Sequence, residues 1–369
     1  MNSIFASMNQ CGPCPNNKQR QRAGTIRTNL DQMRSKYPEL FDRIFLRGEA
    51  IPDSIFMENE NISVLFDELM NDEIIEMVGR NHYIRSKFLI YPIQHCNIIT
   101  DFHHLIELNR VFPIYHENVF LASKLKVPSR GKVLDIGFGS GILSIISVKR
   151  GASEVYATDI SPKTREYAEL NREINNIPSD KIHFLIGNVY NPLPENIKFD
   201  LICSNPPFLA IPSHTPYYIH SNGGPTGTDV IKTILIGLKD RIASRGYFQM
   251  INMSLGDNKC PFIAKLLYDY LSDQNVSIRI ELLQNPLELD DYITNLKRKM
   301  PEKYDEKGIN DWHTSLKTAG FTHFYYLFIE AKWGYPFSIR IEKKIQEANR
   351  NRLLFEQQFM FINGIQWIN

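Results

Sequence analysis

The sequence has almost no excess of charge of either sign and no long hydrophobic run. Its 42 Lys and Arg residues nearly balance 41 Asp and Glu residues over 369 positions, so no global field favours nucleic acid or an anionic membrane as partner. No apolar run approaches the roughly 18 to 20 residues that a helix needs to cross a bilayer, and the N-terminus does not resemble a signal peptide. We therefore predict a globular, cytoplasmic protein without membrane contact.

Cysteine is also scarce, with five residues in the chain. Cys11-Gly-Pro-Cys14 has the spacing of a dithiol redox centre, but it lies in a polar stretch without the strand that precedes such a centre, so a redox role is not expected. The other three lie among apolar residues and are expected to be buried thiols: Cys96, Cys203 and Cys260. Without a second close pair of Cys or His residues, no metal site is predicted.

Hydrophobic periodicity divides the chain into four parts. Residues 1–24 are polar and predict a flexible tail. Residues 25–110 carry short helical and strand patterns, which predict a helix and β-hairpin module that recognises or covers a substrate. Residues 111–340 alternate strand and helix patterns and predict an α/β domain with a parallel sheet and helices on its faces. Residues 341–369 predict a C-terminal helix and tail.

The predicted α/β domain contains an insertion near residues 287–320, which includes Trp312 and His313. Such a segment could wall in a small substrate or serve as a structural cover, and both interpretations stay open.

A glycine-rich turn follows the first strand of the α/β pattern, in Asp135-Ile-Gly137-Phe-Gly139-Ser-Gly141. Glycine lets the backbone approach a ligand closely, and the helix that follows offers unpaired N–H groups. A dinucleotide site expects Gly-x-Gly-x-x-Gly, whereas here the third glycine comes one residue early and Ile142 stands in its place. The spacing argues against NAD or FAD and leaves room for S-adenosylmethionine, which has no pyrophosphate.

Two further residues extend this predicted site at the ends of the next two strands. Asp159 ends the second strand, where its carboxylate can accept hydrogen bonds from ribose hydroxyls. Asn188 follows the third strand in Gly187-Asn188-Val189, where its amide can reach an adenine or simply form a turn. Asp159 makes a ligand site the favoured interpretation of the glycine turn.

The motif Asn205-Pro206-Pro207-Phe208 follows the fourth strand. Two prolines fix φ and remove both N–H groups, so the carbonyl of Pro206 is a rigid acceptor, and the side-chain carbonyl of Asn205 is a second one. A planar NH₂ or amide N–H can donate to both, and Phe208 can stack on the planar group. Because the methyl group of S-adenosylmethionine is already activated, geometry and desolvation can supply most of the acceleration. The motif predicts methyl transfer to nitrogen rather than a mere strand-ending turn.

An aromatic stretch follows the motif, in Pro212-Ser-His214-Thr-Pro216-Tyr217-Tyr218. It predicts that the acceptor pocket is lined by Pro207, Tyr217 and Tyr218, with simple core packing as the equal alternative.

Together these motifs make residues from about 111 to 255 resemble a class I S-adenosylmethionine-dependent methyltransferase. They are most similar to the Asn-Pro-Pro-Tyr/Phe group, which includes HemK-type protein-glutamine methyltransferases and small-domain rRNA guanine and tRNA adenine N-methyltransferases. The resemblance implies a Rossmann-like fold with a mainly parallel seven-stranded sheet and helices on both faces. Phe208 stands where HemK-type enzymes usually carry Tyr, and the mixed N-terminal module replaces their helical bundle.

The resemblance also implies site residues by position. The catalytic group is Asn205, Pro206 and Phe208. The cofactor-binding group is Tyr115, Asp135, Gly137, Gly139, Gly141, Asp159, Ile160, Asn188, Val189 and Asn205. Residues 111–120 are similar to a segment that covers the cofactor, and residues 221–229 are similar to a glycine-rich loop downstream of the motif in the HemK-type group.

We therefore predict a methyltransferase that uses S-adenosylmethionine to methylate a nitrogen of a small molecule or peptide. A nucleic acid acceptor is less favoured because the sequence has no basic stripe. Three alternatives stay open: an enzyme of this fold that cyclises S-adenosylmethionine and releases methylthioadenosine, an RNA or protein-glutamine N-methyltransferase, and a cofactor-binding protein without activity.

Overall fold

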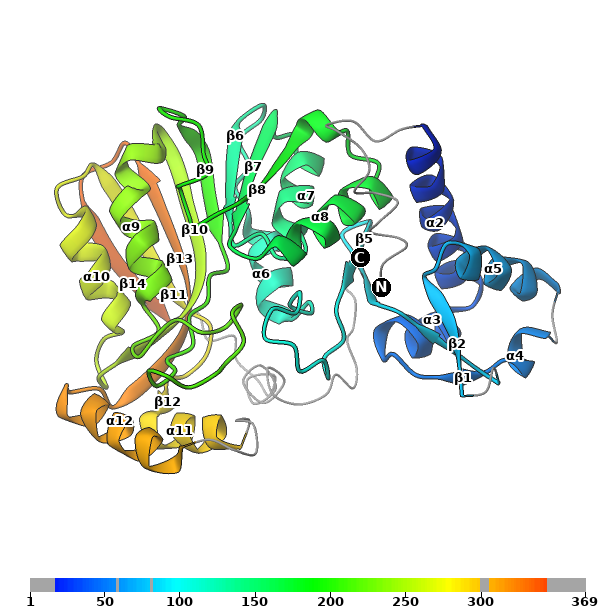
Figure 1. Ribbon diagram of the computed structural model, residues 1–369. Helices are drawn as coiled ribbons and strands as arrows, with labels where there is room; N and C mark the ends of the chain where they lie inside the picture. The colour runs from blue at the N-terminus through cyan, green and yellow to red at the C-terminus, as the bar shows by residue number, and fades with distance from the viewer. Residues whose placement is uncertain (1–16, 58–59, 80–81, 299–304, 344–369) are drawn as a thin grey trace.

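The protein consists of a main domain around one large sheet and a mixed N-terminal module beside it (Figure 1). The computed structural model describes residues 17–57, 60–79, 82–298 and 305–343. The Cys11-Gly-Pro-Cys14 motif and most of the predicted C-terminal helix lie outside these ranges. No helix within them is both long and apolar enough to cross a bilayer.

In the described residues the large sheet has nine strands, in the order β14-β11-β13-β10-β9-β6-β7-β8, with β12 paired to β13. The strands are β6 (Lys132–Ile136), β7 (Glu154–Asp159), β8 (Ile182–Ile186), β9 (Phe199–Ser204), β10 (Ile242–Gly256), β11 (Val276–Leu282), β12 (Leu287–Glu288), β13 (His323–Trp333) and β14 (Ser338–Lys343). The run from β8 to β10 is parallel throughout, whereas β13 is antiparallel to β10 and β11. The predicted Rossmann-like, mainly parallel sheet is confirmed.

Two strands add to the seven that were predicted, and one of them corrects the predicted C-terminal helix. Strand β14 pairs in parallel with β11, residue by residue from Ser277 and Ser338 onward. Residues 341–343 are therefore strand, not the beginning of a helix. Ser338-Ile-Arg-Ile-Glu-Lys343 alternates apolar and polar residues, as an edge strand does, and the charges that follow concealed this short pattern.

Helices cover both faces of the sheet. They are α6 (His116–Lys124), α7 (Ile142–Lys149), α8 (Pro162–Ile174), α9 (Asp229–Arg241) and α10 (Phe262–Leu271), with a short 3₁₀ turn η2 (Ser179–Lys181). In Figure 1, α6 to α8 lie on one side of the sheet, and α9 and α10 lie on the other. Helix α9 buries Ile231, Ile234, Leu235 and Leu238, the spacing of a helix with one face on a core.

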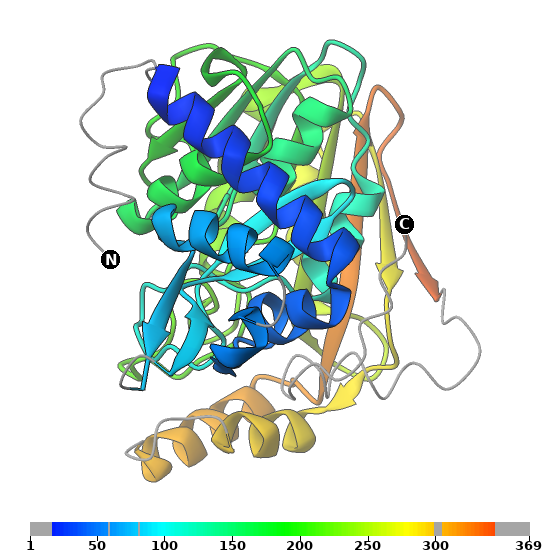
Figure 2. The same cartoon turned by 90° about the vertical axis from the view of Figure 1, so that its right-hand side faces the viewer.

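The N-terminal module combines helices with a small sheet and a separate hairpin. Its helices are α2 (Asn17–Lys36), α3 (Pro38–Phe41), α4 (Ser54–Met57) and α5 (Glu60–Asn71), with a short π-helix η1 (Asp42–Leu46). Strands β1 (Ile51–Pro52), β3 (Tyr83–Ser86) and β2 (Ile75–Val78) form the sheet in that order, and β4 (Leu89–Ile93) and β5 (Cys96–Thr100) form the hairpin. Figure 2 shows α2 and α5 in front of the main domain.

The predicted polar tail is corrected by α2, which includes residues 17–24 of it. Ala23 is buried and begins a helical face that continues through Ile26 and Leu30. Arg22 supports this start, because its Nη2 donates to the Asp72 carbonyl over 3.0 Å and its Nε lies 3.3 Å from the Asp72 carboxylate. The sequence did not predict that the buried face of this helix begins before residue 25, because its first residue is an alanine within a polar run.

Two asparagines of α8 join the N-terminal module to the main domain. Asn171 accepts a hydrogen bond from the Ile99 N–H over 2.8 Å and donates to the Ile99 carbonyl over 2.9 Å. Asn175 makes the same pair of bonds with Asn97, over 3.0 and 2.8 Å. These side-chain amides pair with the backbone of β5 as a neighbouring strand would, so the module is bonded firmly to the helix that follows β7.

The cysteines differ in part from the expectation. Cys96 and Cys203 are buried thiols, as predicted, but Cys260 is exposed. It lies in a turn where the Asp257 carboxylate accepts the backbone N–H groups of Lys259 and Cys260, each over 2.8 Å. The apolar neighbours that suggested burial belong to the adjoining elements instead.

Candidate cofactor and acceptor site

A cavity of about 390 Å³ lies where the parallel strands end. Its walls come from the segments that follow β6, β7, β8 and β9, from the start of α6, and from two loops around residues 103–112 and 217–221. Ligands of open α/β sheets bind outside the carboxyl ends of the strands. The volume is also in the range of small-molecule sites.

Most of the predicted site residues line this cavity. They are Tyr115, Gly137, Gly139, Asp159, Ile160, Asn188, Val189, Asn205, Pro206, Pro207, Phe208, Tyr217 and Tyr218. The structure thus brings together residues that are up to 103 positions apart, from Tyr115 to Tyr218. Their individual roles toward a ligand remain predictions. The two exceptions, Asp135 and Gly141, lie behind the cavity wall.

Asp135 is fully buried beneath the glycine turn. Its Oδ2 accepts hydrogen bonds from the Ser144 backbone N–H over 3.0 Å and from the Ser144 hydroxyl over 2.6 Å. Burial raises the pKa of this carboxyl to about 7, although the bonds from Ser144 oppose the shift. In this structure Asp135 therefore fixes the first turn of α7 and reaches the site only through the glycine turn.

Gly141 stands at the N-cap of α7 with φ of 79°, in the left-handed region. A Cβ there would lie 3.1 Å from the Ala168 Cβ and 3.3 Å from the Phe184 ring. Glycine is thus required by both the backbone and the close approach of α8 and β8.

Gly141→Ala is expected to lower the free energy of unfolding more than the matched change Gly151→Ala. Gly151 also has a positive φ, of 95°, but a Cβ at that position would meet no atom within 4 Å, so its loss should be about 1–2 kcal/mol from the backbone alone. The crowding at Gly141 should add about 1–3 kcal/mol. Urea denaturation of both variants measures the difference, and equal losses would show that the packing at Gly141 imposes no constraint.

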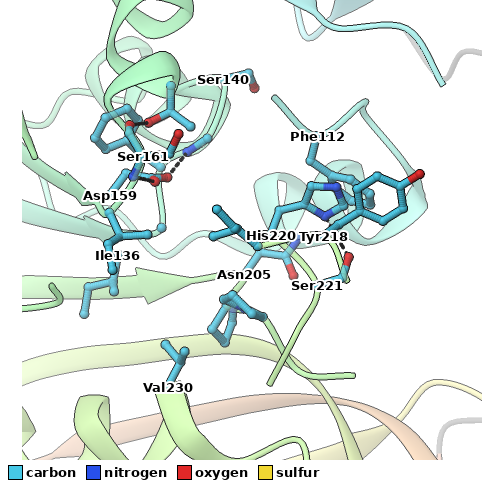
Figure 3. A pocket seen from close by; sticks show the side chains of 18 of the residues that line it. Phe112, Ile136, Ser140, Asp159, Ser161, Asn205, Tyr218, His220, Ser221 and Val230 are labelled. Atoms are coloured by element: carbon cyan, nitrogen blue, oxygen red, sulfur yellow. Dashed lines mark hydrogen bonds between the residues drawn. The ribbon is translucent and has the colours of Figure 1, made fainter. Parts of the chain in front are cut away.

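Asp159 ties two of the ligand-facing turns together. Its Oδ2 accepts the Gly139 N–H and its Oδ1 accepts the Ser161 N–H, each over 2.9 Å. Burial raises the pKa of the carboxyl above its ordinary value, and these backbone bonds oppose the shift. Figure 3 shows Asp159 and Ser161 together on one side of the cavity. Asp159 thus lines the cavity and joins the turns that follow β6 and β7.

Asn205 lies between that side and the aromatic side of the cavity (Figure 3). It follows β9, which is fixed to β6 by a 2.8 Å bond from the Ser204 hydroxyl to the Ile136 carbonyl. The Asn205 Oδ1 is buried, and among the described residues no donor pairs with it. Pro206 behind it is buried and has no N–H. A residue of the cavity wall thus carries a buried acceptor oxygen without a partner among the described residues.

The opposite side is a wall of aromatic and imidazole rings, of which only Tyr218 was predicted from the sequence as a pocket residue. The Phe112 ring lies 4.3 Å from the His220 ring, and His220 stacks on Tyr218 with centroids 5.3 Å apart. The Arg110 guanidinium lies 4.1 Å from the Tyr218 ring centre. Burial lowers the pKa of His220 to about 3, with Arg110 adding to the effect. We call Arg110, Phe112, Tyr218 and His220 the aromatic wall.

A second histidine, His103, also lines the cavity. His103 Nδ1 is 3.0 Å from the Tyr115 hydroxyl, and His103 Nε2 is 3.1 Å from the Tyr91 hydroxyl. Burial, followed by Arg110, lowers the pKa of His103 to about 4, so both imidazoles are neutral at neutral pH. The network joins β4, the loop after the hairpin and the start of α6, and of its three members only Tyr115 was predicted from the sequence.

The predicted insertion supports the acceptor side of the cavity from below. It forms helices α11 (Leu289–Lys297) and α12 (Glu306–Thr318), which lie together at the lower edge of the molecule (Figures 1 and 2). The Tyr292 hydroxyl donates to the Ala210 carbonyl over 2.8 Å, and the Trp312 indole donates to the Pro225 carbonyl over 2.9 Å. Neither residue lines the cavity. Within the described residues the insertion holds the loop that carries Tyr217 to Ser221.

Trp312→Phe is expected to loosen that loop without weakening cofactor binding. The change removes one hydrogen bond, which is worth about 0.5–1.5 kcal/mol, so amide hydrogen exchange in residues 209–227 should accelerate about two- to tenfold. Trp333→Phe is the matched control, because the buried Trp333 indole N–H has no partner among the described residues. Unchanged exchange in the Trp312 variant would contradict a supporting role.

Comparison with known proteins agrees with this geometry. Residues 117–221 match the family model of the methyltransferase small domain. A putative protein N5-glutamine methyltransferase of Methanocaldococcus jannaschii is 28% identical over 155 residues, which cover 40% of this chain and 75% of the relative. A ribosomal protein L11 methyltransferase of Fusobacterium nucleatum is 44% identical over 165 residues, covering 41% of this chain and 51% of the relative.

Solved structures also resemble the chain. The ribosomal protein L11 methylase of Lactobacillus delbrueckii subsp. bulgaricus has 24% sequence identity and a TM-score of 0.33, covering 45% of this chain and 72% of its own. The chain spans three quarters of the first relative above and about half of the second. Residues 117–221 are therefore similar to a methyltransferase small domain, and this segment supplies most of the residues that line the cavity.

Proposed function

We propose that the chain transfers the methyl group of S-adenosylmethionine to a planar nitrogen, either an amide or an exocyclic amine. The observation that carries this proposal is the Asn205 Oδ1, a buried acceptor without a partner among the described residues, on a residue that lines the cavity. A buried acceptor left without a hydrogen bond costs about 1–3 kcal/mol. A nitrogen that donates an N–H to this oxygen would recover that free energy and would be oriented by it.

Different residues of the chain are proposed to bind the cofactor and to orient the acceptor. The cofactor supplies an activated methyl group on a sulfonium. Gly137, Gly139 and Asp159 are proposed to hold it, and Asn205 with the Pro206 carbonyl is proposed to fix the acceptor nitrogen. Phe208 is buried on the cavity wall, where its ring can lie against the acceptor plane and exclude water. Positioning and desolvation then supply the acceleration.

For the acceptor, we propose an amide carried by a protein, in place of the small molecule or peptide favoured by charge balance alone. Two relatives are named for proteins as substrates, one of them for the N5 of glutamine. Two exposed hydrophobic side chains, Ile160 and Ile219, line the cavity, which suits docking of a larger partner. Leu108 is also exposed and adjoins them, because the Ile219 N–H donates to the Leu108 carbonyl over 3.0 Å.

We also propose that the N-terminal module contributes to acceptor recognition. The loop that leaves its hairpin supplies His103, Asn109 and Arg110 to the cavity, and this loop lies within residues 25–110. The module is therefore proposed as part of the site and not only as a cover for α8.

One assay separates these possibilities. The protein is incubated with S-adenosylmethionine alone, with glutamine-containing peptides and proteins, with rRNA, and with a metabolite extract, and products are followed by mass spectrometry. S-adenosylhomocysteine formed with peptides or proteins is the expected result. If S-adenosylhomocysteine forms only with rRNA or with metabolites, the proposal that the acceptor is an amide of a protein would be refuted. Methylthioadenosine without acceptor would indicate cyclisation, and no product from any mixture would leave a binding protein without activity.

A further inference from the structure

Arg110 is a buried cation on the wall of the cavity. Its exposed fraction is 8%, and it lines the same space as Asn205 and Tyr115. No carboxylate of the described residues lies within ion-pair distance of it, because the ion pairs of residues 17–343 do not include Arg110. A buried charge is costly unless it is paired.

Two other cationic side chains with little exposure differ from Arg110, because each forms ion pairs with carboxylates. Arg172 is 3% exposed and pairs with two carboxylates, Glu169 over 2.8 Å and Glu173 over 3.2 Å. Lys163 also pairs with two, Asp101 over 2.9 Å and Glu107 over 2.8 Å. The ion pairs of Lys163 engage Asp101 and Glu107, and neither of these carboxylates pairs with Arg110.

The contacts of Arg110 leave its positive charge uncompensated. Nη1 donates to the carbonyls of His103 and Leu105, over 2.5 and 3.0 Å, and Nε donates to His220 Nε2 over 3.3 Å. The fourth neighbour is the face of the Tyr218 ring, 4.1 Å away. All these groups are neutral at neutral pH, since the pKa values of His103 and His220 are lowered by burial. Nη2 forms no hydrogen bond to any described residue.

We propose that Arg110 binds a carboxylate, or another anionic oxygen group, of a ligand in this cavity. Arginine suits that task because its planar fork can donate two parallel hydrogen bonds to such a group. Two ligands could carry it: the cofactor, through the carboxylate of its methionine end, or the acceptor, through an acidic group near the methylated nitrogen. This inference rests on the proposed function and adds that one of the two ligands carries a negative charge. Its tests measure ligand affinities and need no methyl transfer.

The first arm of the test compares two products of S-adenosylmethionine that differ in the methionine end. S-adenosylhomocysteine has the carboxylate and methylthioadenosine lacks it. If the cofactor is the source, Arg110→Gln should weaken S-adenosylhomocysteine roughly 10- to 100-fold in calorimetric titration, and methylthioadenosine should bind as to the wild type. Arg110→Lys, which keeps the charge, should recover part of the loss.

The second arm addresses the acceptor. Inorganic phosphate is titrated into protein saturated with S-adenosylhomocysteine. If the acceptor is the source, phosphate should bind the wild type and fail to bind Arg110→Gln, while the S-adenosylhomocysteine affinity is equal in both. The two arms therefore distinguish the source of the anion.

Two results would overturn the inference. Equal weakening of both nucleosides in Arg110→Gln would show that Arg110 only braces the loop at residues 103–105. Unchanged S-adenosylhomocysteine affinity together with no phosphate binding to the wild type would show that no anion is recognised. Because these readouts need no methyl transfer, a failed activity assay would leave them interpretable, and failure here would leave the role of Asn205 standing.

Discussion

Asn205→Ala is expected to lower the rate of methyl transfer at least about a hundredfold, because a lost hydrogen bond that orients the reacting atom removes roughly 3 kcal/mol of transition-state stabilisation. The affinity for S-adenosylhomocysteine should stay within about twofold of the wild type, since the buried Oδ1 is proposed to hold the acceptor and not the cofactor. Single-turnover kinetics with the acceptor found by the product assay measures the first quantity, and calorimetry measures the second.

Asn191→Ala is the matched control for this experiment. Asn191 is an exposed asparagine that does not line the cavity, so its variant should keep the wild-type rate of methyl transfer. Full activity in Asn205→Ala would refute the assignment of the nitrogen clamp. If the affinity for S-adenosylhomocysteine falls as well, Asn205 would be assigned to binding of the cofactor and not of the acceptor.

Asp159→Ala is expected to weaken binding of S-adenosylhomocysteine roughly 10- to 100-fold, because a carboxylate that accepts hydrogen bonds from a ligand contributes about 1.5–3 kcal/mol. Methylthioadenosine should be weakened by a similar factor, since both compounds carry the ribose. This shared loss distinguishes the expected role of Asp159 from that of Arg110. Calorimetric titration of both compounds into the purified variant gives the two affinities.

The affinity for the cofactor is expected to depend on pH through the carboxyl group of Asp159. Burial raises the pKa of Asp159, so the group takes up its proton at a higher pH than an ordinary aspartate does. The ionised form is the one that accepts ribose hydroxyls without competition. Affinity should therefore fall on acidification, beginning above the usual range of an aspartate, and Asp159→Ala should flatten this dependence.

Asp273→Ala controls for general effects of removing a carboxylate, because Asp273 is exposed and does not line the cavity. Its cofactor affinity should equal that of the wild type at every pH. An unaltered affinity in Asp159→Ala would contradict the ribose role and would leave Asp159 only as the link between the Gly139 and Ser161 turns.

Many residues that line the cavity could be predicted from the sequence because their signals are local. The glycine turn, Asp159 and Asn205 each follow a buried strand, and parallel strands bring their carboxyl ends to one edge. Gly141 and Asp135 show the limit of such reasoning. Their spacing is part of the motif, but in the folded chain the Asp135 carboxylate bonds to Ser144, and Gly141 allows the close approach of Ala168 in α8.

The acceptor side could not be predicted in the same way. Arg110 and His220 are 110 positions apart and meet only because the hairpin loop and the loop after β9 come together. Trp312 gave an ambiguous signal, since an indole in an insertion fits either a pocket wall or a brace. In the described structure the Trp312 indole donates to the Pro225 carbonyl, which favours a supporting role over a place in the pocket wall.

The bonds from Asn171 and Asn175 to β5 have a practical consequence for anyone dissecting this protein. A fragment that begins near residue 111 would retain the cavity floor but would strip β5 from α8, leaving two buried amides and the apolar face of Tyr167, Leu170 and Ile174 open to water. Exposed surface of that kind promotes aggregation. Truncation at this boundary should therefore yield insoluble material, and the catalytic half is best expressed with its N-terminal partner attached.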